Sequence, residues 1–287
     1  MATLLTLKRR IKTTGNVSKT TKAMQMISAS RLKKAQNAAE SSKAYVQKLD
    51  SISKNLAQKI EKEQMHEYQK TNTETNAKLL IVISPDKGLC GGLVTNLLRE
   101  VLRYSSTGKI YYITIGKKAE STVASLNKDV IASFPFGTTL PEFDAVYPIA
   151  KIINEYFLGR KVAEVKILST KFTSVFTQNP GLSNLLPVTL DAETKLEDTS
   201  TMTIFEPNVQ ELLPDLLQHY LEMVIYQSLL ESYASEQASR MIAMKNATDN
   251  ALDMISELQL EYNKSRQEKI TNELLDIGGG SAEAMYE

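Results

Sequence analysis

Apolar side chains recur every three or four residues near the C-terminal end of the chain, and this pattern predicts one long helix over 208–277. A mean spacing of about 3.5 residues is typical of a coiled-coil seam rather than of a helix on a globular core. Pro214 is the last proline, and we expect the glycine run 278–280 to end the helix. The predicted seam consists of Leu213, Leu216, Tyr220, Met223, Leu230, Ala234, Met241, Met244, Ala251, Ile255, Leu258 and Tyr262, with Gln227, Gln237 and Thr248 in the gaps.

A second long helix is predicted at the other end of the chain, over about 1–62. Its apolar stripes at helical spacing are Leu4, Leu7, Ile11, Thr14, Thr21 and Met24, and then Tyr45, Leu49, Ile52, Leu56 and Ile60. Gly15 is the weak point, because a glycine inside a helix costs about 1 kcal/mol relative to alanine. The sequence therefore favours local fraying or a bend at that position.

The middle of the chain alternates between short apolar runs, which are typical of strands, and segments with helical spacing. Strands are expected at 78–84, 109–115, 129–134 and 162–170, with a further strand or a continuation at 172–177 and another at 202–205. Helices are expected at 93–104, 116–126 and 144–159. The polar stretches 63–76 and 191–200 are expected to be loops. This alternation predicts a small, mostly parallel α/β domain.

Together these elements predict a fold of the α/β class, in which the N- and C-terminal helices form a long antiparallel coiled coil and a small Rossmann-like α/β domain is inserted between them. The expected divisions are 1–62 for the first helix, 77–207 for the domain, 208–277 for the second helix and 278–287 for a flexible tail. Charge supports the pairing of the helices, since 1–62 holds 14 Lys/Arg and 3 Asp/Glu whereas 208–277 holds 5 and 12.

Composition narrows the class of protein further. The 287 residues suffice for one core and an extended element, and the net charge is close to balanced at +1. Cys90 is the only cysteine, so an internal disulfide is excluded and a reducing compartment is favoured. The chain has no apolar run long enough to span a membrane as a helix. Basic residues follow the first leucines, which is the reverse of the order in a signal peptide.

The segment DKGLCGG (86–92) lies between a predicted strand and a predicted helix, where phosphate-binding loops occur. It lacks the Lys-Ser/Thr pair of a P-loop, and the chain lacks the GxGxxG pattern of dinucleotide-binding folds. Gly91 and Gly92 more simply allow the tight turn that starts the helix. A nucleotide-binding enzyme that uses 84–92 is nevertheless an alternative function, and it predicts saturable nucleotide binding by the isolated chain.

Other candidate chemistry is sparse. Neither His66 nor His219 has a ligand partner at metal-site spacing, and Cys90 has no nearby histidine to activate it. We therefore predict a chain that is not an enzyme and that has no cofactor and no metal site. The basic N-terminal helix leaves a nucleic-acid-binding hairpin as a third hypothesis, which predicts binding that weakens steeply with salt. The lack of aromatic residues between its basic positions argues against base stacking.

Four segments resemble one known family, the gamma subunits of rotary F-type ATP synthases, and in particular its bacterial members. The segments are TKAMQMISASRLKKAQ (21–36), SPDKGLCGGLVTNLL (84–98), YASEQASRMIAMKNATDNA (233–251) and ELQLEYNKSRQEKITNEL (257–274). They cover both ends and the centre of the chain, and the C-terminal segments are the most specific. The fold that the resemblance implies, an antiparallel coiled coil with an α/β domain, agrees with the fold predicted from the residues.

The resemblance also implies a function. A gamma subunit is the central rotor shaft that couples proton-driven rotation of the c ring to ATP synthesis or hydrolysis in a ring of three α and three β subunits. It is not catalytic itself, and it binds no nucleic acid. The implied partners are the α and β subunits, in a 3:3:1 ratio with gamma, the ε subunit and the c ring. The implied location is the cytoplasmic face of the bacterial cell membrane, with peripheral attachment through the complex.

Individual residues match family positions that contact partners. Arg266, Gln267 and Thr271 match the contact with a catalytic β subunit, and Met24 matches a position beside an acidic loop of β. Lys22 is one of the basic residues that offer a charge partner to that loop.

Phe205 and Glu206 match the family's foot region, which contacts ε and the c ring. The motif-bearing segment begins almost at Met1, which favours a bacterial member over one with an organelle transit peptide. The redox cysteine pair of chloroplast members has no counterpart here, because Cys90 is alone.

Overall fold

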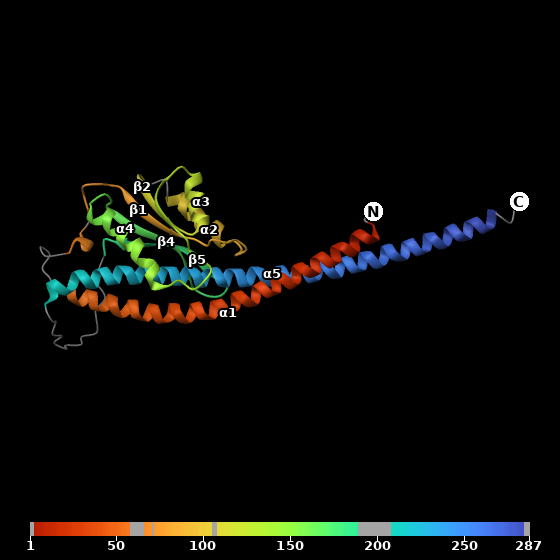
Figure 1. The fold of residues 1–287 in the computed structure, drawn as a ribbon, viewed down its shortest axis with the longest axis horizontal. Coiled ribbons are helices and arrows are strands. Elements are labelled where there is room, and N and C mark those ends of the chain that lie inside the picture. The colour runs from red at the N-terminus through yellow and green to blue at the C-terminus, as the bar shows by residue number, and fades with distance from the viewer. Residues whose placement is uncertain (1–2, 58–65, 71, 105–107, 189–207, 284–287) are drawn as a thin grey trace. The chain divides into compact units, whose positions relative to one another are not determined.

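The computed structural model describes residues 3–57, 66–70, 72–104, 108–188 and 208–283 (Figure 1). The first element along the chain is the long helix α1 (Leu4–Ala57), the last is the long helix α5 (Val209–Glu283), and the shorter elements lie between them in the sequence. The chain divides into two compact units. Unit 1 contains Met1–Ile27 and Met241–Glu287, and unit 2 contains Ser28–Arg240. The boundaries predicted at 62 and 207 and the last four tail residues lie outside the described residues.

Unit 1 is an antiparallel pair of helices with a heptad seam (Figure 1). On α5, Met244, Thr248 and Ala251 are buried, and the 3-4 spacing continues through partly buried Ile255 and Leu258. The Oγ1 atoms of Thr21 and Thr248 share a hydrogen bond of 2.7 Å across the seam. The predicted coiled-coil pattern of the C-terminal helix is therefore confirmed in this unit.

The N-terminal stripes were only partly correct. α1 is helical through Gly15, so the fraying that was one of the two predicted outcomes is not seen there, and an added Cβ at this position would meet no atom within 4 Å. Met24 is 38% exposed, and Tyr45 and Ile52 are 49% and 47% exposed, so none of them belongs to the seam. In unit 2, the buried and half-buried residues of α1 keep a 3-4 spacing that includes the predicted Leu49 and Leu56 but otherwise uses different positions, several of them small or polar. These residues are Ser28, Leu32, Ala35, Ala39, Ser42, Val46, Leu49, Ser53 and Leu56.

α5 differs from the prediction in where it ends and in which of its residues are buried in unit 2. It runs to Glu283, past the glycine run 278–280 that was expected to end it. Glycine weakens a helix but still offers its backbone N–H, and no proline follows to stop the ladder. In unit 2, Leu217 and Leu221 are buried whereas Leu216 and Tyr220 of the predicted seam are only partly buried. There α5 buries most of its surface rather than one stripe, since it packs on both α1 and the α/β elements.

Unit 2 contains a five-stranded sheet with the order β3-β2-β1-β4-β5. The strands are β1 (Lys78–Ile83), β2 (Ile110–Ile115), β3 (Asp129–Phe134), β4 (Glu164–Phe172) and β5 (Gln178–Leu186). The strands β1 to β4 run parallel to one another, and β5 pairs antiparallel with β4. This confirms the mostly parallel α/β domain.

β5 was missed by the sequence analysis, and the strand suggested at 172–177 is mainly the turn that joins β4 to β5. Ser174 organises that turn: its Oγ accepts hydrogen bonds from the backbone N–H groups of Phe176 and Thr177, at 3.3 and 3.1 Å. Pro180 and Gly181 are residues that argue against a strand in a sequence, so β5 was not predicted, but a strand at the edge of a sheet tolerates both. The strand suggested at 202–205 and the loop at 191–200 lie outside the described residues.

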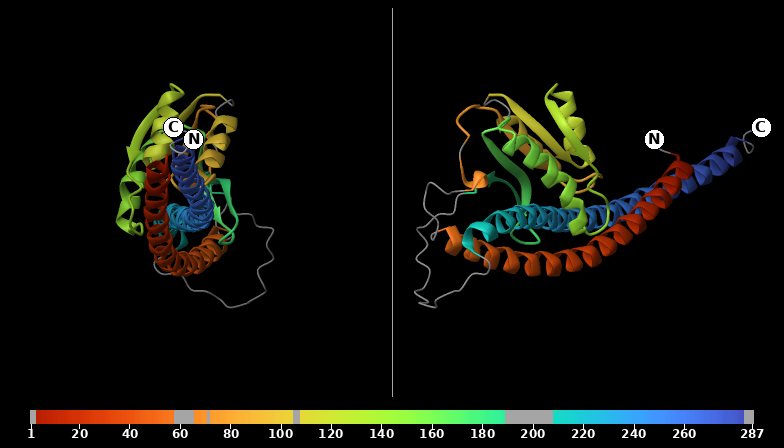
Figure 2. Two further views of the ribbon diagram at one scale, coloured as in Figure 1. Left: turned by 90° about the vertical axis from the view of Figure 1, so that its right-hand side faces the viewer. Right: turned by 60° about the vertical axis from the view of Figure 1, so that its left-hand side comes forward.

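Helices cover both faces of the sheet (Figure 2). α2 (Leu93–Tyr104) and α3 (Lys117–Ser125) pack on one face, and α4 (Val146–Leu158), which is preceded by the short helix η3 (Phe143–Ala145), packs on the other. Right-handed crossovers require this arrangement, since the chain reverses direction across the sheet after β3. The core on the α2 side contains Leu80, Val82, Leu97, Val101, Tyr112, Val123 and Leu168. The remaining short helix, η2 (Glu67–Gln69), precedes β1.

Candidate functional site

The loop after β1 is the place where a nucleotide-binding function would have to reside. Side chains of this segment accept hydrogen bonds from backbone N–H groups of two other segments, the start of α3 and the residues after β3. The Asp86 carboxylate accepts hydrogen bonds from the N–H groups of Lys117 (2.9 Å) and Gly137 (2.8 Å), and Ser84 Oγ accepts one from Ala119 N–H (2.7 Å). Phosphate groups bind such N–H groups at the start of a helix. Asp86 and Ser84 therefore occupy the N–H groups at the start of α3, whereas a phosphate bound by the 86–92 loop would use those at the start of α2.

Helix α5 closes the carboxyl edge of the sheet. Ser239 Oγ donates to the Cys90 carbonyl at 2.6 Å, and Arg240 donates to the carbonyls of Lys87 (3.3 Å) and Gly88 (3.2 Å). Doubly wound sheets bind their ligands in the crevice at this edge, next to the strand where the order reverses. In unit 2 that strand is β1, and α5 side chains fill the place that a ligand would take.

Three further hydrogen bonds extend this junction. Ser235 Oγ donates to the Thr170 carbonyl (3.2 Å) at the end of β4. The hydroxyls of Tyr233 and Tyr226 donate to the carbonyls of Thr138 (3.2 Å) and Pro141 (3.4 Å) in the segment after β3. In every case α5 supplies the donor and the α/β elements supply a main-chain carbonyl. The junction therefore joins the helix to the sheet mechanically.

Glu236 lies buried beside this junction and is only 3% exposed. Its carboxylate pairs with Arg240 at 2.6 Å. Burial raises the pKa of Glu236, with a smaller upward contribution from Asp86, while Arg240 and Arg31 act in the opposite direction. A carboxyl whose pKa is raised by folding binds protons more tightly in the folded than in the unfolded state.

This raised pKa predicts a pH dependence of stability. The free energy of unfolding should decrease as the pH rises from the ordinary pKa of a glutamate to the raised pKa of Glu236. Over this range the carboxyl ionises readily in the unfolded chain, whereas its ionisation is unfavourable in the folded chain. Each unit of pKa shift corresponds to about 1.4 kcal/mol. We expect Glu236→Gln to remove this component. Urea unfolding of the wild type and of Glu236→Gln between about pH 4.5 and 7.5 would check this prediction. If the free energy of unfolding has the same pH dependence in both proteins, the prediction is wrong.

The residues expected to contact the β subunit all lie on the surface of unit 1. Arg266, Gln267 and Thr271 are exposed on α5, and Thr271 Oγ1 donates to the Gln267 carbonyl at 3.0 Å. Met24 and Lys22 are exposed on α1. The structure thus places the two groups on separate helices, and their contact with a β subunit remains a prediction. Phe205 and Glu206 lie outside the described residues.

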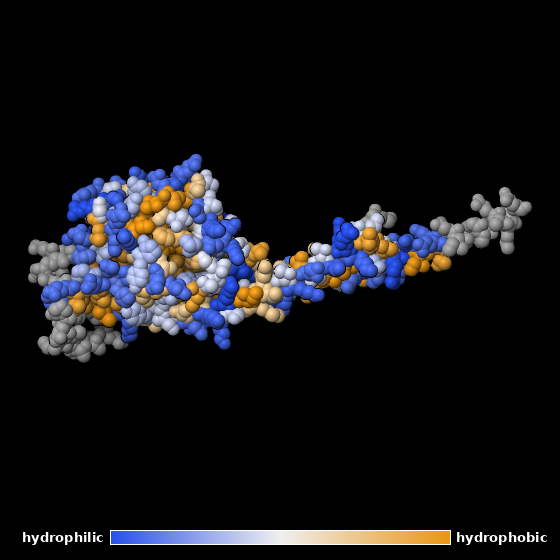
Figure 3. Space-filling view, in the orientation of Figure 1, coloured by the Kyte–Doolittle hydropathy of each residue, from blue (hydrophilic) through white to orange (hydrophobic). Residues whose placement is uncertain are grey.

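Apolar and polar side chains are interspersed along the visible face of unit 1 (Figure 3). Several large apolar side chains on α5 are exposed, among them Leu260 at 69% and Leu274 at 65%. Within the described residues, no helix has the length and hydropathy needed to cross a membrane, and no group of His, Cys, Asp or Glu is arranged to hold a metal ion. Burial raises the pKa of the Cys90 thiol, which disfavours the thiolate that nucleophilic chemistry requires.

Comparison with known proteins decides the family. The family model described as ATP synthase matches residues 3–285. The ATP synthase gamma chain of Dehalococcoides mccartyi (strain CBDB1) is 38% identical over 285 residues, which cover 98% of this chain and 99% of that one. This chain belongs to the ATP synthase gamma-chain family. The gamma chain of Ruthia magnifica subsp. Calyptogena magnifica is 36% identical over 281 residues, covering 96% and 97% of the two chains.

Solved structures agree with the gamma-chain fold. A chain in the central stalk/c-ring structure of the Tetrahymena thermophila mitochondrial ATP synthase is 26% identical, with a TM-score of 0.58, and the match covers 79% of this chain and 98% of that one. A chain in the rotor of the Euglena gracilis enzyme is 19% identical, with a TM-score of 0.54, and shows the same fold. The resemblance inferred from the sequence motifs and the predicted fold class are both confirmed.

The α5 side of the junction was missed by the sequence analysis. Ser235, Ser239 and Arg240 all fall in the segment 233–251, which was recognised only as a family motif. A signal was present, because Ser235 and Ser239 are small polar residues one helical turn apart, on the same face of the predicted helix. Their partners are main-chain carbonyls, however, and sequence patterns give no indication of which carbonyls lie nearby.

Proposed function

We propose that this gamma chain is the central rotor shaft of an ATP synthase. In this role it couples proton-driven rotation of the c ring to ATP synthesis, or ATP hydrolysis to rotation, without catalysing either reaction. The observation that carries the proposal is family membership along almost the whole chain. The paired helices of unit 1 and the junction that fixes α5 to the sheet in unit 2 support it, since both suit a part that transmits torque.

The proposed mechanism is a population shift imposed by rotation. Each β subunit would meet a different face of the shaft in turn, and the contacts made by that face would favour one nucleotide-affinity state over another. Such contacts must form and break once per turn. Exposed polar side chains on a helix satisfy that condition, because a hydrogen bond contributes only about 0.5–1.5 kcal/mol and an exposed ion pair only about 0–1 kcal/mol.

We propose that Arg266, Gln267 and Thr271 on α5 and Met24 and Lys22 on α1 make these contacts with β. The guanidinium of Arg266 offers several donors in a fixed geometry, and the amide of Gln267 can both donate and accept. Met24 offers a flexible, polarizable surface that can adapt to successive neighbours. Lys22 offers a positive charge for an acidic segment.

Replacing the α5 contacts should slow coupled ATP synthesis. We expect Arg266→Ala and Gln267→Ala each to lower proton-driven synthesis in membrane vesicles by about three- to tenfold, the loss of roughly 1 kcal/mol of contact energy. Lys264→Ala is the matched control, because it removes an exposed cation about 200° around the same helix. Equal effects from Lys264→Ala and Arg266→Ala would show that charge on the helix, rather than a specific contact, determines the rate.

The proposed partners are the α and β subunits at 3:3:1 with gamma, the ε subunit and the c ring, with no nucleic acid. We place the chain at the cytoplasmic face of a bacterial cell membrane, attached peripherally through the complex. The foot contact with ε and the c ring would include Phe205 and Glu206. The sequence match to bacterial gamma chains supports this assignment.

Co-purification tests this assembly directly. A tagged chain expressed in its source membranes should elute with α and β subunits in the 3:3:1 ratio, together with ε, the c ring and ATPase activity. Elution alone, or with nucleic acid, would overturn the rotor proposal.

A further inference from the structure

The α/β domain of unit 2 is hydrogen-bonded to one of the two long helices and not to the other. Among the described residues, no hydrogen bond or ion pair joins α1 to this domain. Helix α1 is bonded to α5 instead, through the Tyr45 hydroxyl and His219 Nε2 at 3.0 Å in unit 2. On α5, side chains that donate to main-chain carbonyls of the α/β domain form a set that we call the α5 grip, and its members are Tyr226, Tyr233, Ser235, Ser239 and Arg240.

Three members of the α5 grip share one side of the helix. Tyr226, Tyr233 and Arg240 are spaced seven residues apart, and this spacing places them in one stripe along α5. The two tyrosine hydroxyls reach the segment after β3, and the Arg240 guanidinium reaches the loop after β1. The stripe therefore connects one side of α5 to two loops at the carboxyl edge of the sheet.

The two serines of the grip lie on a different side of α5. Ser235 and Ser239 are four residues apart, and at about 100° per residue their mean position is about 140° around the helix from the first stripe. Their hydroxyls donate to the carbonyls of Thr170, near the end of β4, and Cys90, in the loop after β1. The α/β domain therefore holds α5 from two sides.

Bonds on two sides resist rotation of a helix in a way that bonds on one side do not. A helix held along one stripe can roll about that stripe, but rolling about either stripe here would stretch the bonds of the other. A serine hydroxyl is one torsion away from the backbone and a tyrosine hydroxyl ends a rigid ring, so neither can follow a turning helix far before the hydrogen bond weakens. The grip therefore fixes the angular position of α5 relative to the sheet.

Burial strengthens the central part of the grip. Ser235 is 0% exposed and Tyr233 is 2% exposed, so water has little access to replace their partners. Breaking either bond would leave a buried polar group unpaired, which costs more than a hydrogen bond that water can replace. The two bonds come from opposite sides of the grip, so both sides contain a bond that resists breaking.

We propose that the members of the α5 grip are positioning residues that transmit torque from the α/β domain to α5, and that α1 turns with α5 through its contacts with that helix; this inference rests on the proposed rotor function. Among the described residues, torque that enters at the α/β domain has no polar route into α1. α5 continues into unit 1 as one helix, so a rotation imposed at the grip acts on the whole of it.

Removing hydroxyls from the grip should weaken coupling without stopping catalysis by the complex. The triple variant Tyr233→Phe, Ser235→Ala and Ser239→Ala loses one bond on the first side of α5 and both on the second. In the complete complex in membrane vesicles, we expect the protons pumped per ATP hydrolysed to fall by about threefold or more, because α5 can then turn relative to the sheet under load. ATP hydrolysis by the α, β and gamma assembly released from the membrane should stay within about twofold of the wild type, because that shaft turns without load.

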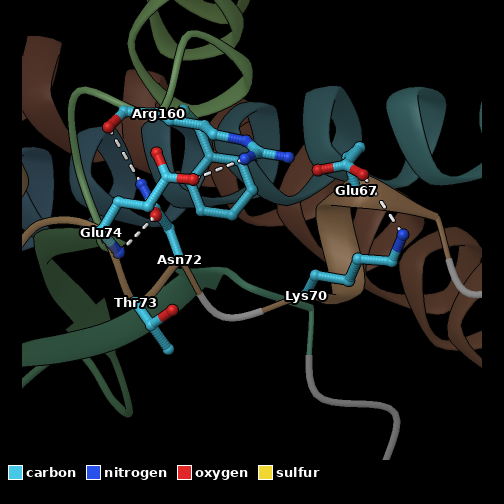
Figure 4. A pocket seen from close by; sticks show the side chains of 7 residues that line it. Glu67, Lys70, Asn72, Thr73, Glu74 and Arg160 are labelled. Atoms are coloured by element: carbon cyan, nitrogen blue, oxygen red, sulfur yellow. Dashed lines mark hydrogen bonds and ion pairs between the residues drawn. The ribbon is translucent and has the colours of Figure 1, made fainter.

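Asn72→Ala is the matched control for loss of a hydrogen bond. The Asn72 amide donates to the main-chain carbonyls of Arg160 at 3.0 Å and Val162 at 3.3 Å, and these bonds join two segments within the α/β domain (Figure 4). Because they do not involve α5, this variant should leave both measurements unchanged. If the triple variant fails to fold, Tyr226→Phe combined with Ser239→Ala takes its place with the same expectations, since both of these side chains are only half-buried.

Each outcome decides between the proposal and a purely structural role. An unchanged ratio of protons pumped to ATP hydrolysed would overturn the proposal. An equal loss of hydrolysis in the released assembly would also overturn it, because the hydroxyls would then act only in folding or assembly, and so would an equal fall of the ratio with Asn72→Ala. If the wild-type chain supports neither proton pumping nor ATP synthesis, the rotor function itself is wrong.

Discussion

Replacing Gly116 with alanine should destabilise the α/β part of unit 2 on the order of 4 kcal/mol, among the largest effects of a single methyl group. Gly116 follows β2 with a φ of 99°, and an added Cβ would lie only 1.9 Å from the Ser84 carbonyl oxygen. Real Cβ atoms do not approach a backbone oxygen so closely. The backbone of one strand end would therefore have to move.

The strand ends around Gly116 have little freedom to move. Ser84 N–H donates to the Ile115 carbonyl, and Gly116 N–H donates to the Phe134 carbonyl, both at 2.8 Å. Ser84 Oγ also accepts the bond from Ala119 N–H that begins α3. A displacement at position 116 would thus disturb β1, β2, β3 and α3 at once.

Gly15→Ala provides a matched control with the opposite sign. Gly15 is inside α1, and a Cβ there would meet nothing within 4 Å. Alanine at such a position should stabilise the helix by about 0.5–1 kcal/mol. Urea unfolding followed by circular dichroism would check both changes, with each unit analysed as its own transition. If the two variants shift their transitions in the same direction, the steric argument for Gly116 is wrong.

The sequence predicted the parallel strands and their helices well because local signals agree there. β1 is a continuous apolar run, as a strand buried on both faces must be, and α2 carries apolar residues at helical spacing after a glycine pair. The limits of α2 and β3 match the predicted ranges 93–104 and 129–134. In these segments the pattern, the turn residues and the tertiary environment all favour the same structure.

Other features could not be predicted because long-range packing overrides the local pattern. The α1 seam continues through Ser28, Ala35 and Ser42, which are too small or too polar to be recognised as core. The Asn72 amide donates a hydrogen bond to the Arg160 carbonyl, 88 residues further along the chain, and no spacing rule connects those positions. The β-subunit contacts depend on a partner chain, so their assignment still rests on the family motif.

Placing proline at position 251 should abolish the transmission of torque through α5 if the chain is a rotor shaft. Ala251 is buried in the seam of unit 1, at 6% exposure. Proline removes the backbone N–H, and its ring clashes with the carbonyl of residue 247, at a cost of about 3 kcal/mol or more. A bend there would also move the residues beyond it away from their positions on the rod.

Ala251→Gly separates helix continuity from loss of the seam methyl group. Glycine removes the same buried methyl and costs about 1 kcal/mol, but it keeps the helical hydrogen bond and adds no ring. We expect proton-driven ATP synthesis to decrease at least tenfold with Ala251→Pro and less than about threefold with Ala251→Gly, since transmitted torque depends on an unbroken helix. The bonds between Ser239, Arg240 and the loop after β1 lie in unit 2, so unfolding of the α/β domain should be unchanged in both variants. Normal ATP synthesis with Ala251→Pro would mean that torque is transmitted although α5 is not continuous at this point. In that case α1 would have to transmit the torque past residue 251.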